Sequence, residues 1–386
     1  MRALADGGFV RATDGAEVRA DDVGFAGTTN WAAARSGGAF SLEDSSLEWA
    51  NGWARDLWVS DEGAVVAGKG SSVLLDAIVA TGNTAMRGGV LWADGSSWVE
   101  VLESRFEGNL GLVDAGVLGL HGSADGQITG NRFCANDSGL GGAALSLAGF
   151  ATGRLEVQNN VFQDNTGWAG GTMLAIGTGL SPGDGLSVVN NTFLGNGGSA
   201  VAVADTPLAL WNNILMGSAV GLAWVGVSTV EGGHNLWNGN DLDTVGASLP
   251  GIGAVLADPT FHHYLPGDCD SVLWLAPGSP ARDAGTHTLT DPDGSRSDIG
   301  AYGGPLSDLP DGDADGWYAD LDCADDLAGV HPGATEVPYD GIDQDCDGAD
   351  LCDVDLDGFD AWECDGPDCD DGESEVNPDA TEAWYD

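Results

Sequence analysis

The sequence is poor in basic residues. It has 12 Lys plus Arg against 61 Asp plus Glu, so the formal net charge of the 386 residues is -49, and Lys69 is the only lysine. Such a charge repels nucleic-acid phosphates and anionic membrane surfaces, so neither is expected as a partner. Cations and basic surfaces are the partners that this charge favours.

Long apolar runs and helical patterns are missing too. No apolar run reaches the ~20 residues that cross a bilayer, so no membrane span is expected. No stretch keeps the period of an amphipathic helix, and no glycine-rich phosphate loop follows a strand and opens a helix. No signal peptide is recognisable at the N-terminus. Helical membrane proteins and nucleotide-binding α/β enzymes are therefore disfavoured.

Glycine is abundant, with 62 residues, and the chain repeats a short unit. One copy covers residues 155–165 and centres on Phe162. The same frame fits around other centres spaced 22 to 31 residues apart, namely Ala80, Phe106, Phe133, Phe193 and Leu215. A small residue and Gly before an apolar run, as at Gly88–Gly89 and Gly141–Gly142, keep the same period. Two markers with one period indicate a repeat architecture.

Each unit contains short strands whose apolar side chains, such as Leu155, Val157 and Phe162, return to one face. One unit cannot bury that face alone, whereas stacked units share a continuous core. We therefore predict an all-β fold, a parallel β-helix over residues 1–305, with neighbouring coils about 4.8 Å apart. Because residues 7–25 already have the pattern of a coil, we expect the mature protein to begin upstream of Met1.

Asparagine recurs two residues before four of the centres and three residues after five of them. In stacked coils these positions form two ladders whose amides bond from coil to coil, and Asn also tolerates the left-handed backbone of tight corners. The ladder residues are Asn131, Asn160, Asn191 and Asn213, and Asn83, Asn109, Asn136, Asn165 and Asn196.

These units resemble the right-handed parallel β-helix repeats of secreted bacterial surface proteins, such as the passengers of polymorphic outer-membrane proteins. Residues 257–261, 277–285 and 298–303 resemble the ending of many bacterial β-helix proteins, ADP.F … SPA.DAG … DIGAY. The resemblance implies a right-handed, pectate-lyase-like helix that residues 219–305 close. It does not define an activity, because one fold carries many functions.

A glycan-cleaving enzyme of this fold needs carboxylates close together on an outer face. Glu48, Glu100 and Glu156 share one register but fall in alternate coils, about 10 Å apart, which is at or beyond the ~6.5–9.5 Å of an inverting pair. Leu74 and Gln127 lie between them, so solvated surface charge is favoured and no catalytic residue is assigned.

Several aromatic and imidazole side chains have two interpretations. Trp31, Trp49, Trp53 and Trp58 either fill the core and corners or stack on sugars at an exposed wall, and the first is favoured. His262 and His263 are adjacent, so in a strand their side chains point in opposite directions, and a structural role is favoured over a metal site.

The tail, residues 306–386, is a different object. Residues 311–386 hold 27 Asp or Glu and no Lys or Arg. Such a segment repels itself and stays disordered unless cations neutralise it. Three DxDxDG stretches have the pattern that opens a calcium loop, in which alternating carboxylates converge and Gly permits the turn. The predicted Ca²⁺ ligands are Asp311, Asp313, Asp315, Asp320, Asp322, Asp343, Asp345, Asp347, Asp353, Asp355 and Asp357.

The position that closes each loop differs. Asp322 occupies the twelfth position of the first loop, where a closing carboxylate is expected. The third loop has Cys364 there, so Glu363, Asp368, Asp370 or Asp371 has to close it. The tail also repeats itself, because residues 331–340 match residues 377–386, and we expect the natural chain to continue beyond Asp386.

The tail resembles the metal-binding repeats of secreted myxobacterial and methanotroph surface proteins, through Asp322-Cys323-Ala324-Asp325-Asp326 and Asp345-Cys346-Asp347-Gly348. Tyr339 stands where that family usually has Cys. The family carries a copper association, but this tail has one His and no Met, so Ca²⁺ is favoured through its preference for oxygen ligands.

Five of the seven Cys lie in the tail, which is typical of a secreted protein with disulfides. The expected pairs are Cys323–Cys346 and Cys352–Cys364, with Cys369 left without its partner. Zinc is the alternative, but no CxxC is present. Cys134 and Cys269 are either buried thiols or a further pair.

The sequence thus favours a non-enzymatic, secreted extracellular or cell-surface protein, with calcium-binding repeats that serve as spacer or adhesion module. An extracellular polysaccharide or another cell-surface protein is the expected partner. The alternatives are a polysaccharide lyase or glycoside hydrolase of the pectate-lyase-like fold, and a non-catalytic glycan-binding module.

Overall fold

The computed structural model describes residues 9–27, 36–95, 97–122, 124–150, 154–167, 171–177, 185–226, 229–246, 251–307, 313, 317 and 322–381. The chain divides into two compact units, Met1–Ser307 and Asp308–Asp386. We call the first the solenoid unit and the second the tail.

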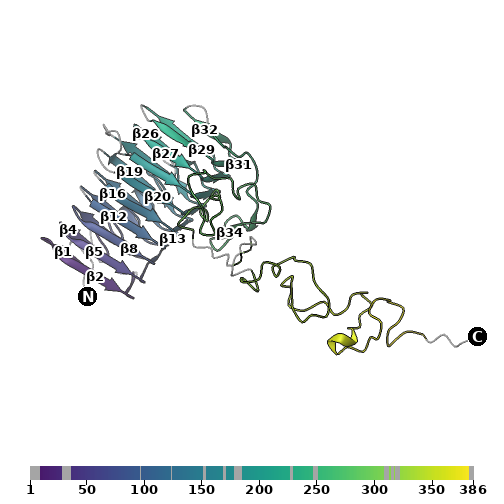
Figure 1. Cartoon of the computed structure of the whole chain (residues 1–386). Helices are drawn as coiled ribbons and strands as arrows, with labels where there is room; N and C mark the ends of the chain where they lie inside the picture. The colour runs from purple at the N-terminus through teal and green to yellow at the C-terminus, as the bar shows by residue number, and fades with distance from the viewer. Residues whose placement is uncertain are drawn as a thin grey trace, which may run out of the picture. The chain divides into compact units, whose positions relative to one another are not determined.

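Three long sheets build the solenoid unit, with strands stacked coil upon coil (Figure 1). Among the described residues, sheet 1 has ten strands, and sheets 2 and 3 have nine each. Each coil contributes a strand to sheet 1, then to sheet 2 and then to sheet 3, and in four coils a strand of a smaller sheet follows. The pairings within the three long sheets are parallel, as between β4 (Phe40–Glu43) and β7 (Val66–Lys69). The predicted all-β parallel β-helix is thereby confirmed. Its right-handed winding stays a prediction, supported by the rule that parallel crossovers are right-handed.

The strands are short and follow the sheet order. Sheet 1 contains β1 (Val10–Thr13), β4, β7, β11 (Leu91–Asp94), β15 (Leu118–His121), β19 (Leu145–Phe150), β23 (Met173–Gly177), β26 (Ser199–Ala204), β29 (Val220–Val225) and β32 (Leu242–Val245). Sheet 2 contains β2 (Glu17–Asp21), β5 (Ser46–Ala50), β8 (Ser72–Asp76), β12 (Ser97–Leu102), β16 (Ala124–Thr129), β20 (Arg154–Gln158), β24 (Gly185–Val189), β27 (Leu208–Trp211) and β30 (Val230–Gly233). Sheet 3 contains β3 (Gly24–Ala26), β6 (Trp53–Arg55), β9 (Val79–Thr81), β13 (Arg105–Glu107), β17 (Arg132–Cys134), β21 (Val161–Gln163), β25 (Thr192–Leu194), β28 (Ile214–Met216) and β31 (Leu236–Asn238).

The remaining elements are few. A parallel sheet of four strands contains β10 (Thr84–Arg87), β14 (Leu110–Asp114), β18 (Asp137–Ser138) and β22 (Thr166–Gly167). Two antiparallel strands, β33 (Phe261–His263) and β34 (Val272–Leu275), follow the coils. The tail contains one short 3₁₀ helix, η1 (Trp362–Cys364).

The repeat centres form one column in the core. Phe106, Phe133, Phe162 and Phe193 are fully buried, and their rings stack with centroids 5.0, 4.9 and 4.6 Å apart. Ala80 and Leu215 continue the column in register at its two ends. The predicted frame is therefore the packing repeat of the molecule.

The two predicted asparagine ladders are also confirmed. Asn131 donates to Asn160, and Asn160 donates to Asn191, through amide bonds of 2.9 and 3.0 Å. The second ladder repeats this between Asn109 and Asn136, at 3.0 Å. Each side chain also donates to a backbone carbonyl of a neighbouring coil, as Asn160 does to Ile128. Because these amides are buried, their complete pairing ties each coil to the next.

The left-handed corner residues are not the ladder residues. The positive φ angles lie one position earlier, at Asn159, Asn190 and Asn212, with φ of 52°, 51° and 56°. The interpretation that one Asn serves both purposes is corrected, because two neighbouring positions divide these roles. The corner residue makes the turn, and the next residue points inward to bond along the stack.

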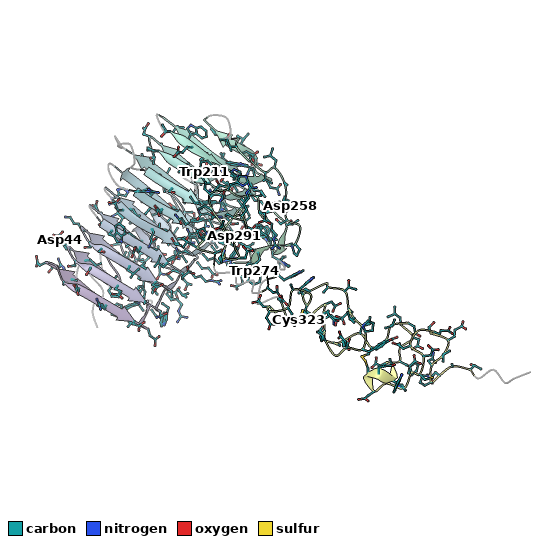
Figure 2. All side chains as sticks on the ribbon, viewed as in Figure 1. Asp44, Trp211, Asp258, Trp274, Asp291 and Cys323 are labelled. Atoms are coloured by element: carbon teal, nitrogen blue, oxygen red, sulfur yellow. A yellow bond between two sulfur atoms is a disulfide. The ribbon has the colours of Figure 1, made fainter. Side chains whose placement is uncertain are left out.

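Residues 255–305, which we call the strap, lie along the outer face of sheet 3. The expectation that they simply close the end of the helix is corrected. Leu273, Leu275 and Ile299 of the strap form a second buried cluster with outward side chains of β21, β25, β28 and β31. Arg132 donates to the carbonyl of Ser271 at 2.8 Å, and the disulfide Cys134–Cys269 joins β17 to the strap. Trp274 and Asp291 mark the strap in Figure 2.

Candidate metal-binding loops of the tail

Two of the acidic loops have the same backbone architecture, ten residues apart. In the loop of residues 343–348, the Asp347 N–H donates to Asp343 at 3.1 Å, and the Gly348 N–H donates to the same carboxylate at 2.8 Å. In the loop of residues 353–358, Asp357 and Gly358 donate to Asp353 at 3.1 and 3.0 Å. In each loop, the carboxylate of the first Asp thus accepts two backbone N–H groups and holds the turn.

Glycine is required at the end of each loop. Gly348 and Gly358 have φ of 111° and 96°, which residues other than glycine rarely adopt. The Gly of the DxDxDG pattern therefore makes the turn that lets alternating carboxylates converge.

Glu336 completes the loop of residues 343–348. It accepts the N–H of Asp345 at 2.8 Å and the N–H of Leu351 at 3.2 Å. Carboxylate oxygens of Glu336, Asp343 and Asp345 all lie within 4.8 Å of one another. Burial and the neighbouring charges of Asp347 and Glu336 raise the pKa of Asp345. Three carboxylates this close repel one another unless a cation or a proton lies between them.

The loop of residues 353–358 is completed by residues from further along the chain. Oxygens of Asp353, Asp355 and Asp357 lie within 4.8 Å of one another, and those of Asp355, Asp368 and Asp371 form a second such group. Asp368 is 0% exposed and Asp371 is 8% exposed. Of the four candidates for closing this loop, the structure brings Asp368 and Asp371 into these groups.

Several oxygens in these two groups have no partner within the described residues. Oδ2 of Asp355, Asp357 and Asp368 is buried and accepts no hydrogen bond. A buried carboxylate oxygen without a donor is costly, because neither water nor protein replaces its lost hydration. Burial and the charge of Asp357 also raise the pKa of Asp355. A cation that binds all these oxygens at once removes both penalties.

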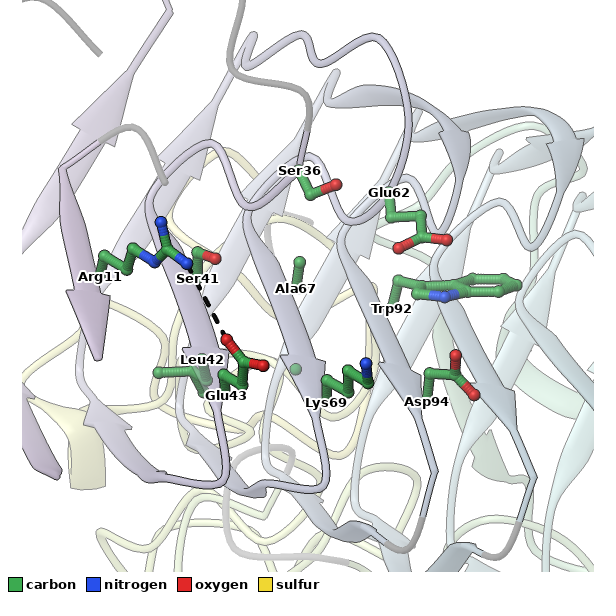
Figure 3. A pocket seen from close by; sticks show the side chains of 11 residues that line it. Arg11, Ser36, Ser41, Leu42, Glu43, Glu62, Ala67, Lys69, Trp92 and Asp94 are labelled. Atoms are coloured by element: carbon green, nitrogen blue, oxygen red, sulfur yellow. Dashed lines mark ion pairs between the residues drawn. The ribbon is translucent and has the colours of Figure 1, made fainter. Parts of the chain in front are cut away.

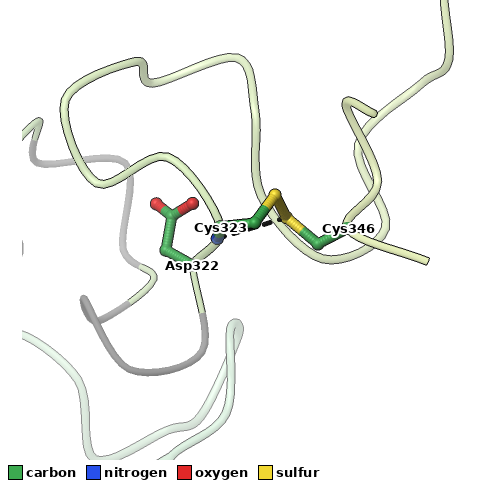
Figure 4. A group of neighbouring side chains, drawn as sticks. All are labelled: Asp322, Cys323 and Cys346. Carbon is green, nitrogen blue, oxygen red and sulfur yellow. Dashed lines mark hydrogen bonds between the residues drawn. A yellow bond between two sulfur atoms is a disulfide. The ribbon is translucent and has the colours of Figure 1, made fainter. Parts of the chain in front are cut away.

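The predicted first loop is only partly described. Asp311, Asp315 and Asp320 lie outside the described residues, whereas Asp313 and Asp322 lie within them. Asp322 is 7% exposed, and its Oδ2 has no hydrogen-bond donor among the described residues. Figure 4 shows the Asp322 carboxylate pointing away from the disulfide of the adjacent Cys323 with Cys346. These sulfur atoms are bonded to each other and cannot act as thiolate ligands.

Disulfides fix the tail between the loops. The expected pairs Cys323–Cys346 and Cys352–Cys364 are confirmed, and the open alternative for Cys134 and Cys269 is resolved as a third pair. Cys369 is free and exposed. Disulfides persist in oxidising compartments, so these bonds indicate an extracellular-type environment.

Tyr339 links two parts of the tail instead of forming a disulfide. Its hydroxyl donates to Asp371, and this bond raises the pKa of Tyr339 to about 12. The N–H of Val354 donates to the same carboxylate at 3.1 Å. The residue that departs from the family pattern thus positions one of the closing carboxylates.

The three glutamates that were considered for a glycan-cleaving site do not meet in the described part of the solenoid unit. Glu48, Glu100 and Glu156 lie in one register of sheet 2, separated by Leu74 and Gln127. Each has its own neighbour, as Glu156 has Arg154 at 3.0 Å and Glu100 has Gln127 at 3.0 Å.

Some tryptophans fill the core and others are exposed, so each of the two interpretations fits part of the set. Trp49 is fully buried among Phe25 and Phe40, whereas Trp53 and Trp58 are 43% and 45% exposed. Trp31 lies outside the described residues. Of the adjacent histidines, His262 has a pKa lowered by burial and by Arg282.

Asp114, His121 and Ser146 meet on the solenoid but do not form a nucleophilic triad. The Ser146 hydroxyl donates to one oxygen of Asp114 at 2.6 Å, and His121 Nε2 lies 3.3 Å from the other. Burial acts to raise the pKa of Asp114, but the hydrogen bonds from His121 and Ser146 outweigh it and lower the pKa. A nucleophile requires its hydroxyl to face the imidazole, and here it faces the carboxylate instead.

The comparisons with known proteins agree with a metal-binding tail. Residues 322–350 and 368–386 match a family model, Cu-binding MopE, described as a "Putative metal-binding motif". The match covers a minor part of the chain and includes Glu336, Asp343, Asp345, Asp368 and Asp371. No curated protein and no solved structure matches the chain significantly. In the described part of the chain, no helix is both long and apolar enough to cross a membrane.

Sequence reasoning did not include Glu336 among the ligands, and it named Asp368 and Asp371 only as alternatives for closing the third loop. The signal for two of them was present, because Asp368 and Asp371 stand 46 residues after Asp322 and Asp325 in the tail's internal repeat. Glu336 had a weaker signal, since it lies before the loop that it completes.

Proposed function

We propose that this chain is a non-enzymatic extracellular or cell-surface protein whose tail binds Ca²⁺ and folds around it. The observation that carries this proposal is the set of buried, unpartnered oxygens of Asp355, Asp357 and Asp368, next to a further carboxylate from Asp371. The solenoid unit is a rigid, extended surface, and the tail acts as a cation-dependent spacer or adhesion module. The proposed partner is an extracellular polysaccharide or another cell-surface protein.

The donor set favours calcium over copper. Ca²⁺ takes six to eight oxygen ligands, mostly carboxylates and carbonyls, whereas copper is held by imidazole, thiolate or thioether groups. The described groupings offer carboxylates, and four tail cysteines are bonded in disulfides. His331 is the only imidazole of the tail, which contains no Met. The copper association in the name of the matching family therefore does not fit the donors present here.

Calcium affinity is expected in the range of extracellular modules, roughly 10⁻⁴–10⁻³ M, because the loops are irregular. The full chain, treated with a chelator and then titrated with CaCl₂ or CuSO₄ in a calorimeter, tests this. Calcium should bind at more than one site and slow hydrogen exchange at residues 343–371. Absence of calcium heat, or copper binding that excludes calcium, would overturn the proposal.

A matched pair of variants locates the site. The double change Asp355→Asn and Asp368→Asn should remove one calcium site, because Asp355 belongs to both oxygen groups of its loop and Asp368 to one of them. Asp379→Asn removes a negative charge outside the groupings and should leave the number of sites unchanged. Equal losses in both variants would mean that calcium is attracted only by the overall charge.

A further inference from the structure

A groove of about 260 Å³ crosses the outer face of sheet 1, over β1, β4, β7 and β11 (Figure 3). Its walls are polar. Glu62, Lys69, Trp92 and Asp94 line one part of it, and Arg11 and Glu43 form an ion pair at 3.9 Å in another. The volume is slightly below the usual range of drug-sized pockets and suits a ligand of one or two small rings.

Trp92 supplies a fixed hydrogen-bond donor to this groove. Its side chain is 3% exposed, and its Nε1 is buried with no acceptor among the described residues. The ring cannot turn away, because it lies over Gly119, where an added Cβ would come within 2.3 Å of it. The His121 ring, with its centroid 4.4 Å away, and the Arg87 guanidinium, 5.6 Å from the Trp92 ring centroid, hold it on other sides. A buried indole N–H normally finds a partner, so this one indicates a ligand acceptor atom.

Charged groups of both signs surround that donor. Figure 3 shows the indole between the carboxylates of Glu62 and Asp94. Lys69 stands in register between Glu43 and Asp94 on adjacent strands, yet within the described residues it forms no ion pair. Arg87 holds Glu62 in place through a bond of 2.9 Å. The groove therefore presents an N–H donor, an ammonium donor and two carboxylate acceptors at close quarters.

The chemistry of these groups selects a class of ligand. A metal cation is disfavoured, because Lys69 and the indole N–H face the same space. An anionic ligand meets three carboxylates against two cations, one of which is already paired with Glu43. Sugar hydroxyl groups both accept and donate hydrogen bonds, so a single neutral sugar can accept from Trp92 and Lys69 while donating to Glu62 and Asp94.

We propose that this groove is a binding site for a neutral saccharide, with Trp92 Nε1 as its central donor. The site lies wholly within the solenoid unit and does not depend on calcium binding by the tail. Failure of the calcium experiments would leave this inference standing, and the converse holds as well.

The test uses the full chain on an array of neutral glucan, mannan and galactan oligosaccharides with uronic-acid oligosaccharides alongside, followed by calorimetry with the best-bound compound. Neutral oligosaccharides should bind, and Trp92→Phe, which keeps the ring but removes the donor, should weaken binding about tenfold or more, the size expected for a lost buried hydrogen bond. Trp98→Phe makes the same chemical change at a half-exposed tryptophan of sheet 2 and should leave the affinity unchanged.

Asp94→Asn is the second variant, because its side chain is exposed and the change should not disturb folding. It should also weaken binding, which keeps the test decisive if Trp92→Phe unfolds the protein. The inference is wrong if no neutral oligosaccharide binds, if only uronic-acid compounds bind, or if Asp94→Asn binds as tightly as the unchanged protein.

Discussion

The solenoid unit and the tail are both built from short, non-helical segments, but different interactions hold them. In the solenoid unit, stacked Phe rings and buried Asn ladders join each coil to the next, and the amides are paired within the protein. In the tail, the buried polar groups are carboxylates such as Asp355 and Asp368, and some of their oxygens have no protein partner. The ladder amides of the solenoid unit find their partners within the polypeptide, whereas several carboxylate oxygens of the tail have none among the described residues.

This difference follows from what each sequence can bury. A coil adds apolar residues with every repeat, so stacking creates a core without any cofactor. The tail carries 28 acidic residues and few apolar ones, so in the proposed function disulfides and bound cations replace a core. We expect changes in the solenoid unit to act on stability whatever ions are present, and changes in the tail to act through ion binding.

The largest effect is expected from the disulfide that ties the strap to the coils. Cys134 and Cys269 are 135 residues apart, and the chain-entropy treatment of so long a loop gives a contribution of about 5 kcal/mol. Replacing both by Ala should lower the melting temperature of the solenoid unit strongly, as followed by circular dichroism. Replacing Cys323 and Cys346 by Ala should leave that transition unchanged while weakening calcium binding. A solenoid transition that responds equally to both changes would contradict the separation of the two units.

The next largest effect is expected inside the Asn ladder. Asn160→Ala leaves partners in two neighbouring coils unsatisfied, because Asn160 accepts from Asn131 and donates to Asn191 and Ile128. Loss of such a buried network should cost about 3 kcal/mol, measured by denaturant unfolding. Calcium should not restore this loss. Recovery on adding calcium would mean that the solenoid unit also depends on ions.

Most of the solenoid unit could be predicted from the sequence, because each coil repeats the pattern of the others, so an irregular residue in one coil does not hide the repeat. The Phe column and the Asn ladders are visible as fixed spacings around Phe106, Phe133 and Phe162. The strap could not be placed, since its contacts join residues far apart in the sequence, as between Arg132 and Ser271, which are 139 positions apart. A signal was nevertheless present: Val161, Ile214 and Leu236 are apolar at outward positions where earlier coils have Arg105 and Arg132, and the strap covers them.

The sequence predicted the loop motifs of the tail but not which carboxylates complete each loop. DxDxDG identifies a loop because its Gly and alternating Asp act locally, as in residues 353–358. Asp368 and Asp371 approach that loop only because the chain folds back after it, and the disulfide Cys352–Cys364 joins the residues on its two sides. A spacing rule for a standard loop counts to the twelfth residue and therefore reaches Cys364 instead.

A third, smaller effect concerns pH, with opposite signs in the two units. In the strap, burial and the charge of Asp291 raise the pKa of Asp298 to about 7, although the N–H of Asp283 donates to it and acts in the other direction. The folded unit then retains a proton that the unfolded chain has released, so its stability should fall as pH rises from about 4 to about 7. In the tail, acid pH protonates the ligands and should weaken calcium binding.

Thermal unfolding of the solenoid unit between pH 5 and pH 8 measures this. Asp298→Asn should reduce the pH dependence, because the amide cannot ionise yet still offers an oxygen to the Asp283 N–H, and the remainder comes from Asp291, whose pKa burial raises to about 6. Asp258→Asn, which removes another strap carboxylate, should leave the dependence in place. If both variants behave alike, general charge repulsion and not Asp298 controls the response.

The smallest effect is expected on the outer surface of the same coil that holds Asn160. Glu156 pairs with Arg154 at 3.0 Å, but the Arg154 side chain is 63% exposed, so water already competes for both charges. Exposed ion pairs of this kind contribute about 0–0.5 kcal/mol, so Glu156→Gln should barely change the melting temperature. Asn160, only four residues later, should cost several times as much, because its partners cannot turn to water. A large loss in Glu156→Gln, or neutral-glycan turnover that disappears with it, would show that the register of Glu48, Glu100 and Glu156 does more than solvate the sheet. The contrast between the two faces of this coil would then no longer follow from burial alone.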